Sequence, residues 1–177
     1  MDLGTLLSVL VILVIFLVIG TLAYGGWSAA PWVPLWRRDV RRMLALAEIK
    51  PGEKLIDLGA GDGRIIVMAA RRYQANAVGY EIAILPFFFG YIRIILTGTH
   101  GRAELKYKNF FHQDLGQADV ITAFLTPQAM EKLKPKLETE TKPGCRIVSY
   151  AFAVPGWQPT KIDKPNQKTS RIFLYRR

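Results

Sequence analysis

The chain is poor in the residues that build disulfides and metal centres. Its 177 residues include one cysteine, Cys145, and two histidines, His100 and His112. A single cysteine excludes an intramolecular disulfide and any cysteine metal cluster. The two histidines are too few and too isolated to indicate a set of metal ligands, so we expect no metal at the functional site.

Several nucleotide and nucleic-acid signatures are missing as well. The sequence has no G-x-x-x-x-G-K-[ST] phosphate loop, no zinc finger and no RNA-recognition signature. The region after Trp36 is nevertheless basic, because it carries all 24 Lys and Arg but only 13 of the 14 Asp and Glu residues, which leaves a formal charge of +11. Such a charge suits an anionic lipid surface or nucleic acid. The missing motifs favour the lipid surface and disfavour a nucleic-acid partner.

Charge and proline are absent from residues 3–23, LGTLLSVLVILVIFLVIGTLA. About 20 apolar residues cross the hydrocarbon core of a bilayer as a helix, and this run lacks the polar face of a helix buried in a soluble core. A cleaved signal peptide is the competing interpretation, but it has a basic start and a shorter apolar core. This chain starts Met1-Asp2, so we interpret residues 1–24 as a retained transmembrane anchor.

The orientation of this anchor is predicted by the distribution of arginine. No Lys or Arg precedes Trp36, and WRRDVRR then places four arginines within about 20 residues of the helix end, where the positive-inside bias acts. We therefore expect a single-pass membrane protein with its domain in the cytoplasm. Tyr24, Trp27, Trp32 and Trp36 suit an interfacial aromatic belt; packing against the domain is the alternative for some of them.

We interpret residues 25–45 as a linker and an amphipathic helix that precedes the main domain, and residues 46–177 as that domain. GGWSAAPWVPLW is rich in Gly and Pro, and RRDVRRMLALAEI has apolar residues at helical spacing. Short apolar runs then alternate with helical patterns, which predicts an α/β fold, a Rossmann-like sheet with helices on both faces. The predicted strands are 54–58, 77–80, 104–110, 120–125, 146–152, 160–163 and 172–175, and the predicted helices are 63–73, 84–97 and 128–140. FHQDLGQ, between the third and fourth strands, is too short for a crossover helix and needs a tight or 3₁₀ connection.

The stretch DLGAGDGR, residues 57–64, joins a predicted strand to a predicted helix through a glycine turn. Glycine permits positive φ and close approach of a ligand to the backbone, and open parallel sheets bind ligands beyond the carboxyl ends of their strands. The dinucleotide pattern G-x-G-x-x-G requires glycine where Arg64 stands, and Asp57 and Asp62 would repel a pyrophosphate. S-adenosylmethionine has an ammonium, a sulfonium and no phosphate, so it suits a turn lined with acids.

Two further carboxylates follow the next predicted strands. Glu81 ends the second strand, 18 residues beyond Gly63, at a position where an acid accepts both ribose hydroxyls in dinucleotide folds. Asp114 follows the third strand and is our candidate acceptor for the adenine amino group. Structural roles stay open beside these: Asp62 as the cap of the following helix, Asp114 as the cap of a turn, and Glu81 as a scaffold residue.

The run Asp57-Leu58-Gly59-Ala60-Gly61-Asp62-Gly63 matches the first motif of class I S-adenosylmethionine-dependent methyltransferases, and Glu81 matches their second-strand acid. With PWVPLWRRDVRR, FLTPQAMEKLKPKL and FAVPGW, residues 25–160 resemble the FAM173-type family of small, membrane-anchored lysine methyltransferases, some of which act on mitochondrial proteins. The resemblance implies that substrate binds near residues 124–127 and that S-adenosylmethionine is held by the acids and the turn: Asp57, Gly59, Ala60, Gly61, Asp62, Glu81 and Asp114.

The segment Phe124-Leu125-Thr126-Pro127 follows the fourth strand, where many amino methyltransferases carry Asn or Asp and then Pro-Pro-Tyr to hold a planar nitrogen. No side-chain amide or carboxylate is present here, which disfavours methylation of adenine or glutamine. A lysine amine needs only proton loss, which an apolar pocket favours by lowering its pKa, and alignment. We name Phe124, Thr126 and Pro127 as candidate catalytic residues, with Phe152 and Trp157 as further walls of the pocket; ordinary packing is the alternative for the aromatic residues.

The leading functional hypothesis is therefore an enzyme at the membrane surface that methylates a lysine of a membrane or membrane-associated protein. A methyltransferase for a lipid or a quinone-like small molecule is the second hypothesis, because the anchor would favour it equally. The third is a binding module that has kept the fold and lost catalysis.

Overall fold

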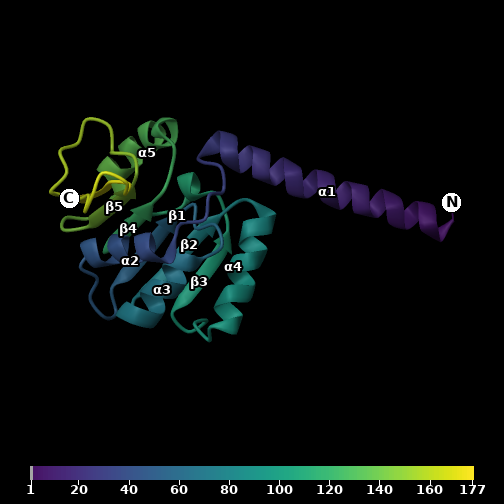
Figure 1. Cartoon of the computed structure of the whole chain (residues 1–177), viewed down its shortest axis with the longest axis horizontal. Helices are drawn as coiled ribbons and strands as arrows, with labels where there is room; N and C mark the ends of the chain where they lie inside the picture. The colour runs from purple at the N-terminus through teal and green to yellow at the C-terminus, as the bar shows by residue number, and fades with distance from the viewer. Residues whose placement is uncertain (1) are drawn as a thin grey trace.

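The computed structural model describes residues 2–177 as a long helix followed by an α/β domain (Figure 1). The helices are α1 (Leu3–Ser28), α2 (Arg37–Leu46), α3 (Arg64–Tyr73), α4 (Ile84–Leu96), the 3₁₀ helix η1 (Phe110–His112) and α5 (Pro127–Glu140). The strands are β1 (Lys54–Leu58), β2 (Asn76–Glu81), β3 (Ala103–Tyr107), β4 (Val120–Ala123), β5 (Arg146–Tyr150), β6 (Lys161–Asp163) and β7 (Ile172–Arg176).

The described strands form one seven-stranded sheet with the order β3-β2-β1-β4-β5-β7-β6. Strands β1 to β5 are parallel, whereas β7 runs antiparallel to both β5 and β6. The chain order reverses at β1, which pairs with β2 on one side and β4 on the other. A reversal of this kind leaves a crevice beyond the carboxyl ends of the strands, and the turn at residues 59–63 lies there.

Helices cover both faces of the sheet, as the alternation of apolar patterns predicted. On β1, Leu55 faces the cluster that contains α2, α3 and α4, while Ile56 faces the cluster that contains α5. Both side chains are almost completely buried, because successive residues of a strand point to opposite faces. The predicted Rossmann-like sheet with helices on both faces is thus confirmed.

The connection between β3 and β4 is short, as predicted, and contains the single 3₁₀ turn η1 among the described residues. Asn109 caps this turn, because its side-chain oxygen accepts the N–H of Phe111 at 3.0 Å. Strand β3 ends at Tyr107, three residues before the predicted end. The chain leaves the sheet early and turns, which changes the set of residues that lies at the end of this strand.

Helix α1 continues through Ser28, so the first residues of the predicted linker are helical. Gly25 does not break the helix; it is buried, and a β-carbon there would lie 3.8 Å from the side chains of Ile82 and Ala83. The most apolar stretch of α1 has no residue buried against the protein, and the helix is long and apolar enough to cross a membrane. It projects away from the domain (Figure 1), which excludes a helix of the soluble core.

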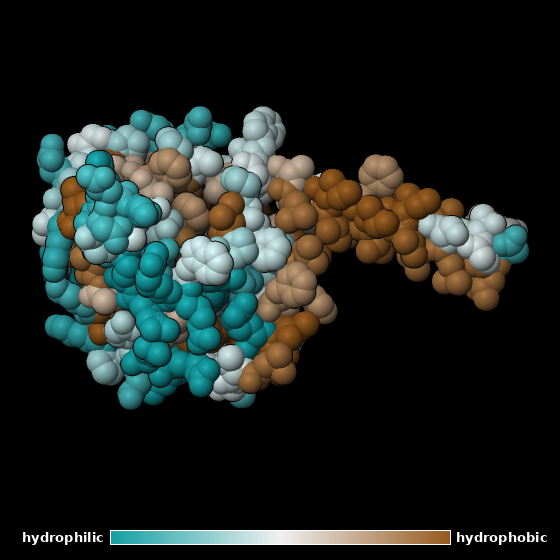
Figure 2. Space-filling view, in the orientation of Figure 1, coloured by the Kyte–Doolittle hydropathy of each residue, from teal (hydrophilic) through white to brown (hydrophobic). Residues whose placement is uncertain are grey.

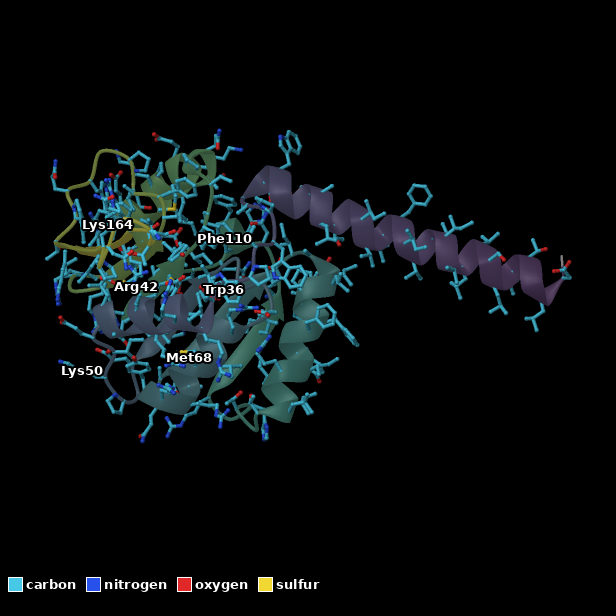
Figure 3. All side chains as sticks on the ribbon, viewed as in Figure 1. Trp36, Arg42, Lys50, Met68, Phe110 and Lys164 are labelled. Atoms are coloured by element: carbon cyan, nitrogen blue, oxygen red, sulfur yellow. The ribbon has the colours of Figure 1, made fainter. Side chains whose placement is uncertain are left out.

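Helix α2 belongs to the domain. Val40, Met43 and Leu44 are fully buried against the sheet. Arg42, labelled in Figure 3, ties this helix to the tail because its Nε donates to Asp163 at 2.8 Å. The segment between α1 and α2 is therefore held at both ends.

Candidate cofactor site

The glycine turn after β1 is shaped by three residues with positive φ. Gly59, Gly61 and Gly63 have φ of 75°, 55° and 69°, a region where a β-carbon is strained. The N–H groups of Gly59 and Ala60 donate to the carbonyl of Tyr80 at 3.1 and 2.9 Å, which fastens the turn to the end of β2. A cavity opens above this turn, and its walls include all predicted residues of the turn from Gly59 to Asp62.

Asp57, at the carboxyl half of β1, is buried and forms part of the cavity wall. Its Oδ1 accepts the hydroxyl of Thr122 at 2.7 Å, whereas its Oδ2 has no hydrogen-bond partner among residues 2–177. Burial raises the pKa of Asp57 to about 7; the Thr122 hydroxyl opposes this shift and the nearby charges of Glu81 and Asp62 add to it. A buried carboxylate oxygen with no partner is costly, so this atom suits a cationic ligand.

Glu81, the last residue of β2, also lines this cavity. Its Oε2 accepts the N–H of Gly61 at 2.7 Å, and its Oε1 accepts those of Ile82 and Ala83 at 2.8 Å each. These bonds hold the carboxylate beside the turn. An ionised carboxylate has about four lone-pair sites, so Glu81 retains capacity for a ligand hydroxyl.

Asp62 also contributes to the wall, but its carboxylate is committed to two arginines. Arg64 donates to it at 2.5 and 2.7 Å, and Arg93 of α4 donates at 2.7 Å. Although burial alone raises the pKa of Asp62, the hydrogen bond and charge of Arg64 and the charge of Arg93 lower it below its usual value. Gly63, and not Asp62, is the N-cap residue of α3, although the backbone N–H of Arg64 in the first turn of α3 also lowers the pKa of Asp62.

Residues 29–35, which lie between α1 and α2, close the cavity over the turn; we call them the strap. All seven strap residues line the cavity, together with Leu22 and Gly25 of α1. The Trp32 ring lies so close to Gly61 that a β-carbon there would sit 3.0 Å from its Nε1. Trp32 also stacks on Phe89 of α4 with ring centroids 6.1 Å apart. The end of the hydrophobic helix is thus part of the site.

Only the first two residues of the segment after β4 line the cavity. Phe124 and Leu125 line the cavity, and the Phe124 ring packs edge-on against Tyr150 at 4.9 Å. The Thr126 hydroxyl donates to the carbonyl of Ala29 at 2.8 Å and caps α5, and Pro127 begins that helix. Neither Thr126 nor Pro127 lines the cavity; Thr126 fastens the strap to the segment after β4 through its bonds to Ala29.

Three further predicted residues lie away from the cavity. Asp114 is exposed, and its Oδ1 accepts the N–H of Gly116 at 2.8 Å, because the early end of β3 moves this residue along the connection. Phe152 is 40% exposed. Trp157 packs on Tyr175 and donates its ring N–H to Glu138. None of the three is among the residues that line the cavity.

The prediction missed the strap, Lys108 and Phe110, all of which line the cavity. Phe110, labelled in Figure 3, begins η1 directly beyond β3. The prediction placed both Lys108 and Phe110 inside a strand over 104–110, whereas β3 ends at Tyr107. Trp32 was assigned to an interfacial aromatic belt with packing against the domain as the alternative, and its contacts with Gly61 and Phe89 support the alternative.

Comparison with known proteins identifies the family. A model of the ANTKMT methyltransferase domain matches residues 57–161. A protein-lysine N-methyltransferase of Saccharolobus islandicus (strain REY15A) is 43% identical over 148 residues, which cover 82% of this chain and 92% of that protein. The chain belongs to the ANTKMT methyltransferase family. The predicted resemblance to FAM173-type lysine methyltransferases is thereby confirmed.

A mouse relative of the family is longer than this chain. The adenine nucleotide translocase lysine N-methyltransferase of Mus musculus is 33% identical over 147 residues, which cover 82% of this chain. The matched region covers 62% of the mouse protein. The similarity therefore extends over most of this chain but leaves more than a third of the mouse protein unmatched.

A solved structure shows the same fold with a product of the cofactor bound. An RNA methyltransferase from Salinibacter ruber in complex with S-adenosyl-L-homocysteine superposes with a TM-score of 0.78 at 31% identity, over 81% of this chain and 93% of that one. The protein of this chain is an S-adenosylmethionine-dependent methyltransferase. The unpartnered Oδ2 of Asp57 and the glycine turn suit the cationic, phosphate-free cofactor. Among residues 2–177, no group of three His, Cys, Asp or Glu side chains is arranged to hold a metal.

Proposed function

We propose that this methyltransferase modifies the side-chain amine of a lysine in a membrane or membrane-associated protein. The observation that carries the proposal is the strap: the residues that leave the apolar helix α1 form the wall of the cofactor cavity. An acceptor must therefore approach beside the base of α1. Confinement to that layer raises the effective concentration of acceptors in the same membrane.

The acids and the turn would hold the cofactor. Asp57 would receive its ammonium group at Oδ2, and Glu81 would receive a ribose hydroxyl while staying fixed by the N–H of Gly61. When bound, S-adenosylmethionine supplies a methyl group activated by a sulfonium. Asp62 keeps the turn in place through Arg64 and Arg93.

The wall on the acceptor side supports lysine over a planar amide or base. Phe124 and Leu125 stand where a polar side chain would hold a planar nitrogen, and Leu35 of the strap adds a further apolar side chain to the same cavity. Such walls contact the aliphatic stem of lysine and favour its neutral amine by desolvation. The neutral amine is the nucleophile, so the chain's contribution is to bind, desolvate and align it.

We further propose that α1 is retained as a single transmembrane span with the domain in the cytoplasm and its basic surface toward anionic lipid. Removal of α1 by cleavage would take away Leu22 and Gly25, which line the cavity. Arg37, Arg38 and Arg41 are exposed just beyond the strap, the place where positive residues favour the cytoplasmic side.

RNA and lipid are the competing acceptors. The Salinibacter structure carries the name of an RNA methyltransferase, and the region after Trp36 has a charge of +11. The test compares cells with and without the gene, fed with isotope-labelled methionine and separated into protein, RNA and lipid. We expect methyl-lysine to disappear from one or a few membrane proteins when the gene is lost, and to return with the wild type but not with Asp57→Asn. A difference confined to RNA or to lipid would refute the lysine proposal.

A further inference from the structure

Helix α4 has an apolar outer face that no described residue covers. Its exposed side chains include Leu96 at 79% and Phe88 and Ile95 at 55% each, with Phe89 and Tyr91 beside them. Positions 88, 92, 95 and 96 recur at helical spacing on one side of the helix. Contiguous exposed apolar surface of this kind marks an interaction site.

This face adjoins the base of α1. The N–H of Ile84 donates to the Thr21 hydroxyl at 3.2 Å, and Gly25 packs against Ala83 just before α4 begins. Helix α4 runs across the direction of α1 on the side of the domain from which α1 projects (Figure 1). Figure 2 shows hydrophobic atoms on that edge of the domain next to the hydrophobic rod of α1.

The inner face of α4 contacts the cofactor turn. A β-carbon on Gly90 would lie 3.0 Å from the backbone of Asp62, so the helix and the turn are in close contact. Arg93 donates from Nε to the carbonyl of Asp62 at 2.9 Å. Phe89, at the border of the outer face, stacks on Trp32 of the strap. The position of α4 therefore determines the position of the turn and of one wall of the cavity.

We propose that α4 lies in the plane of the membrane interface, with its outer face in lipid, and that it holds the mouth of the cavity at the bilayer surface. The inference rests on α1 spanning the membrane, because a spanning α1 directs this edge of the domain toward the bilayer. Lipid is the occupant that the charges favour: residues 82–103 contain no Asp or Glu that would repel an anionic headgroup. Arg102 is exposed after the helix, whereas Arg93 is paired with Asp62. Helices with one apolar face and basic residues bind in this position.

The test is the accessibility of spin labels on the full chain in vesicles of phosphatidylcholine and phosphatidylglycerol. Labels are placed by Leu96→Cys on α4, by Val11→Cys in the middle of α1, and by Lys50→Cys, an exposed residue on the side of the domain away from α1 (Figure 3). The native Cys145 is fully buried, which raises the pKa of its thiol to about 11, so labelling is directed to the introduced cysteine.

Oxygen enters lipid and a nickel chelate stays in water. Their effects on each label therefore distinguish a label in lipid, a label in water and a label covered by protein. We expect the labels at positions 96 and 11 to be accessible to oxygen and protected from nickel, and the label at 50 to be accessible to nickel. Nickel access at position 96 would overturn the inference. Protection from both reagents there would also overturn it, because a protein partner or a second copy of the chain would then cover α4.

The α1 label distinguishes this failure from failure of the proposed anchor. Lipid exposure at position 11 with water exposure at position 96 would support the anchor and refute only the proposed position of α4 in the membrane interface. Water exposure at both would refute the anchor as well. As a functional test, Ile95→Asp with Leu96→Asp should lower methylation of acceptors in intact membranes several-fold and leave cofactor affinity in detergent unchanged. Unchanged methylation in membranes would refute the positioning role.

Discussion

Asp57 and Asp62 lie five residues apart at the two ends of one glycine turn, and both are buried. The Asp57 carboxylate keeps one oxygen without a partner and has a raised pKa, whereas the Asp62 carboxylate is surrounded by two guanidinium groups and has a lowered pKa. The difference teaches that an acid in a glycine turn is not by itself a ligand-binding group. The carboxylate whose charge the protein leaves uncompensated is available to a cationic cofactor.

Replacement of Asp62 should affect folding most. Asp62→Ala leaves Arg64 and Arg93 without their acid, and we expect the free energy of unfolding to fall by about 2–3 kcal/mol. Removal of one partner from a fully buried ion pair costs about 3–5 kcal/mol. We expect a smaller loss here because the Arg93 side chain is 39% exposed. Urea denaturation measures the loss. A cofactor affinity that falls with unchanged stability would contradict the scaffold role.

Asp57→Asn should lower cofactor affinity without lowering stability. The variant loses the charge opposite the cofactor ammonium, so we expect affinity to fall by about 1.5–3 kcal/mol, or roughly 10- to 150-fold. It also removes a buried carboxylate that is costly when ionised, so above pH 7 the free variant should melt no lower than the wild type. Calorimetric titration and thermal melting check the two halves. Unchanged affinity would remove Asp57 from the ammonium site.

The pH dependence should follow from the raised pKa of Asp57. The free folded protein holds this proton up to about pH 7, so the Asp57 contribution to stability decreases as pH rises from its ordinary value of 3.8 to about 7. Cofactor affinity should change oppositely and rise about tenfold between pH 6 and pH 7.5, before an α-amino group loses its own proton at about pH 7.7–8.0. If cofactor affinity depends on pH as steeply in Asp57→Asn as in the wild type, the titrating group is not Asp57.

The fold and the turn were predictable because their signals are local. Strand β1 was predicted with its observed bounds, because its short apolar run is bounded on both sides by turn residues. Asp57 and Glu81 were recognisable because they stand at the ends of predicted strands. The roles of Asp62 and Asp114 were not, because they depend on where Arg93 lies and on where β3 ends. The strap was not predicted because its contact with Gly61 joins segments about 30 residues apart in sequence.

Trp32 and Trp36 offer a matched pair for testing the strap. Trp32 contacts Gly61 and Phe89, whereas Trp36 is 79% exposed. Trp32→Ala should weaken cofactor binding by about 0.5–1.5 kcal/mol, the range of an aromatic contact, and Trp36→Ala should leave it unchanged. Equal effects of the two substitutions in a calorimetric titration would show that the strap does not close the cavity.

The smallest expected effect belongs to Thr122. Thr122→Val removes the hydroxyl that donates to Asp57 Oδ1 at 2.7 Å, and this hydroxyl opposes the rise in the pKa of Asp57. The midpoint of the affinity profile should therefore move to higher pH by less than about one unit. A shift to lower pH in the same titration would contradict the assignment of Asp57 as the titrating group.

The acceptor itself is tested most directly by transfer of a deuterated methyl group. Purified chain and deuterated S-adenosylmethionine, at a concentration too low to saturate Asp57→Asn, are added to membranes from cells that lack the gene, with Asp57→Asn as the matched control that binds little cofactor. Fragmentation mass spectrometry then locates the label. We predict deuterated methyl on the Nζ of one or a few lysines in membrane proteins, absent with the control variant. Label recovered in RNA or lipid while the lysines stay unlabelled would contradict the account.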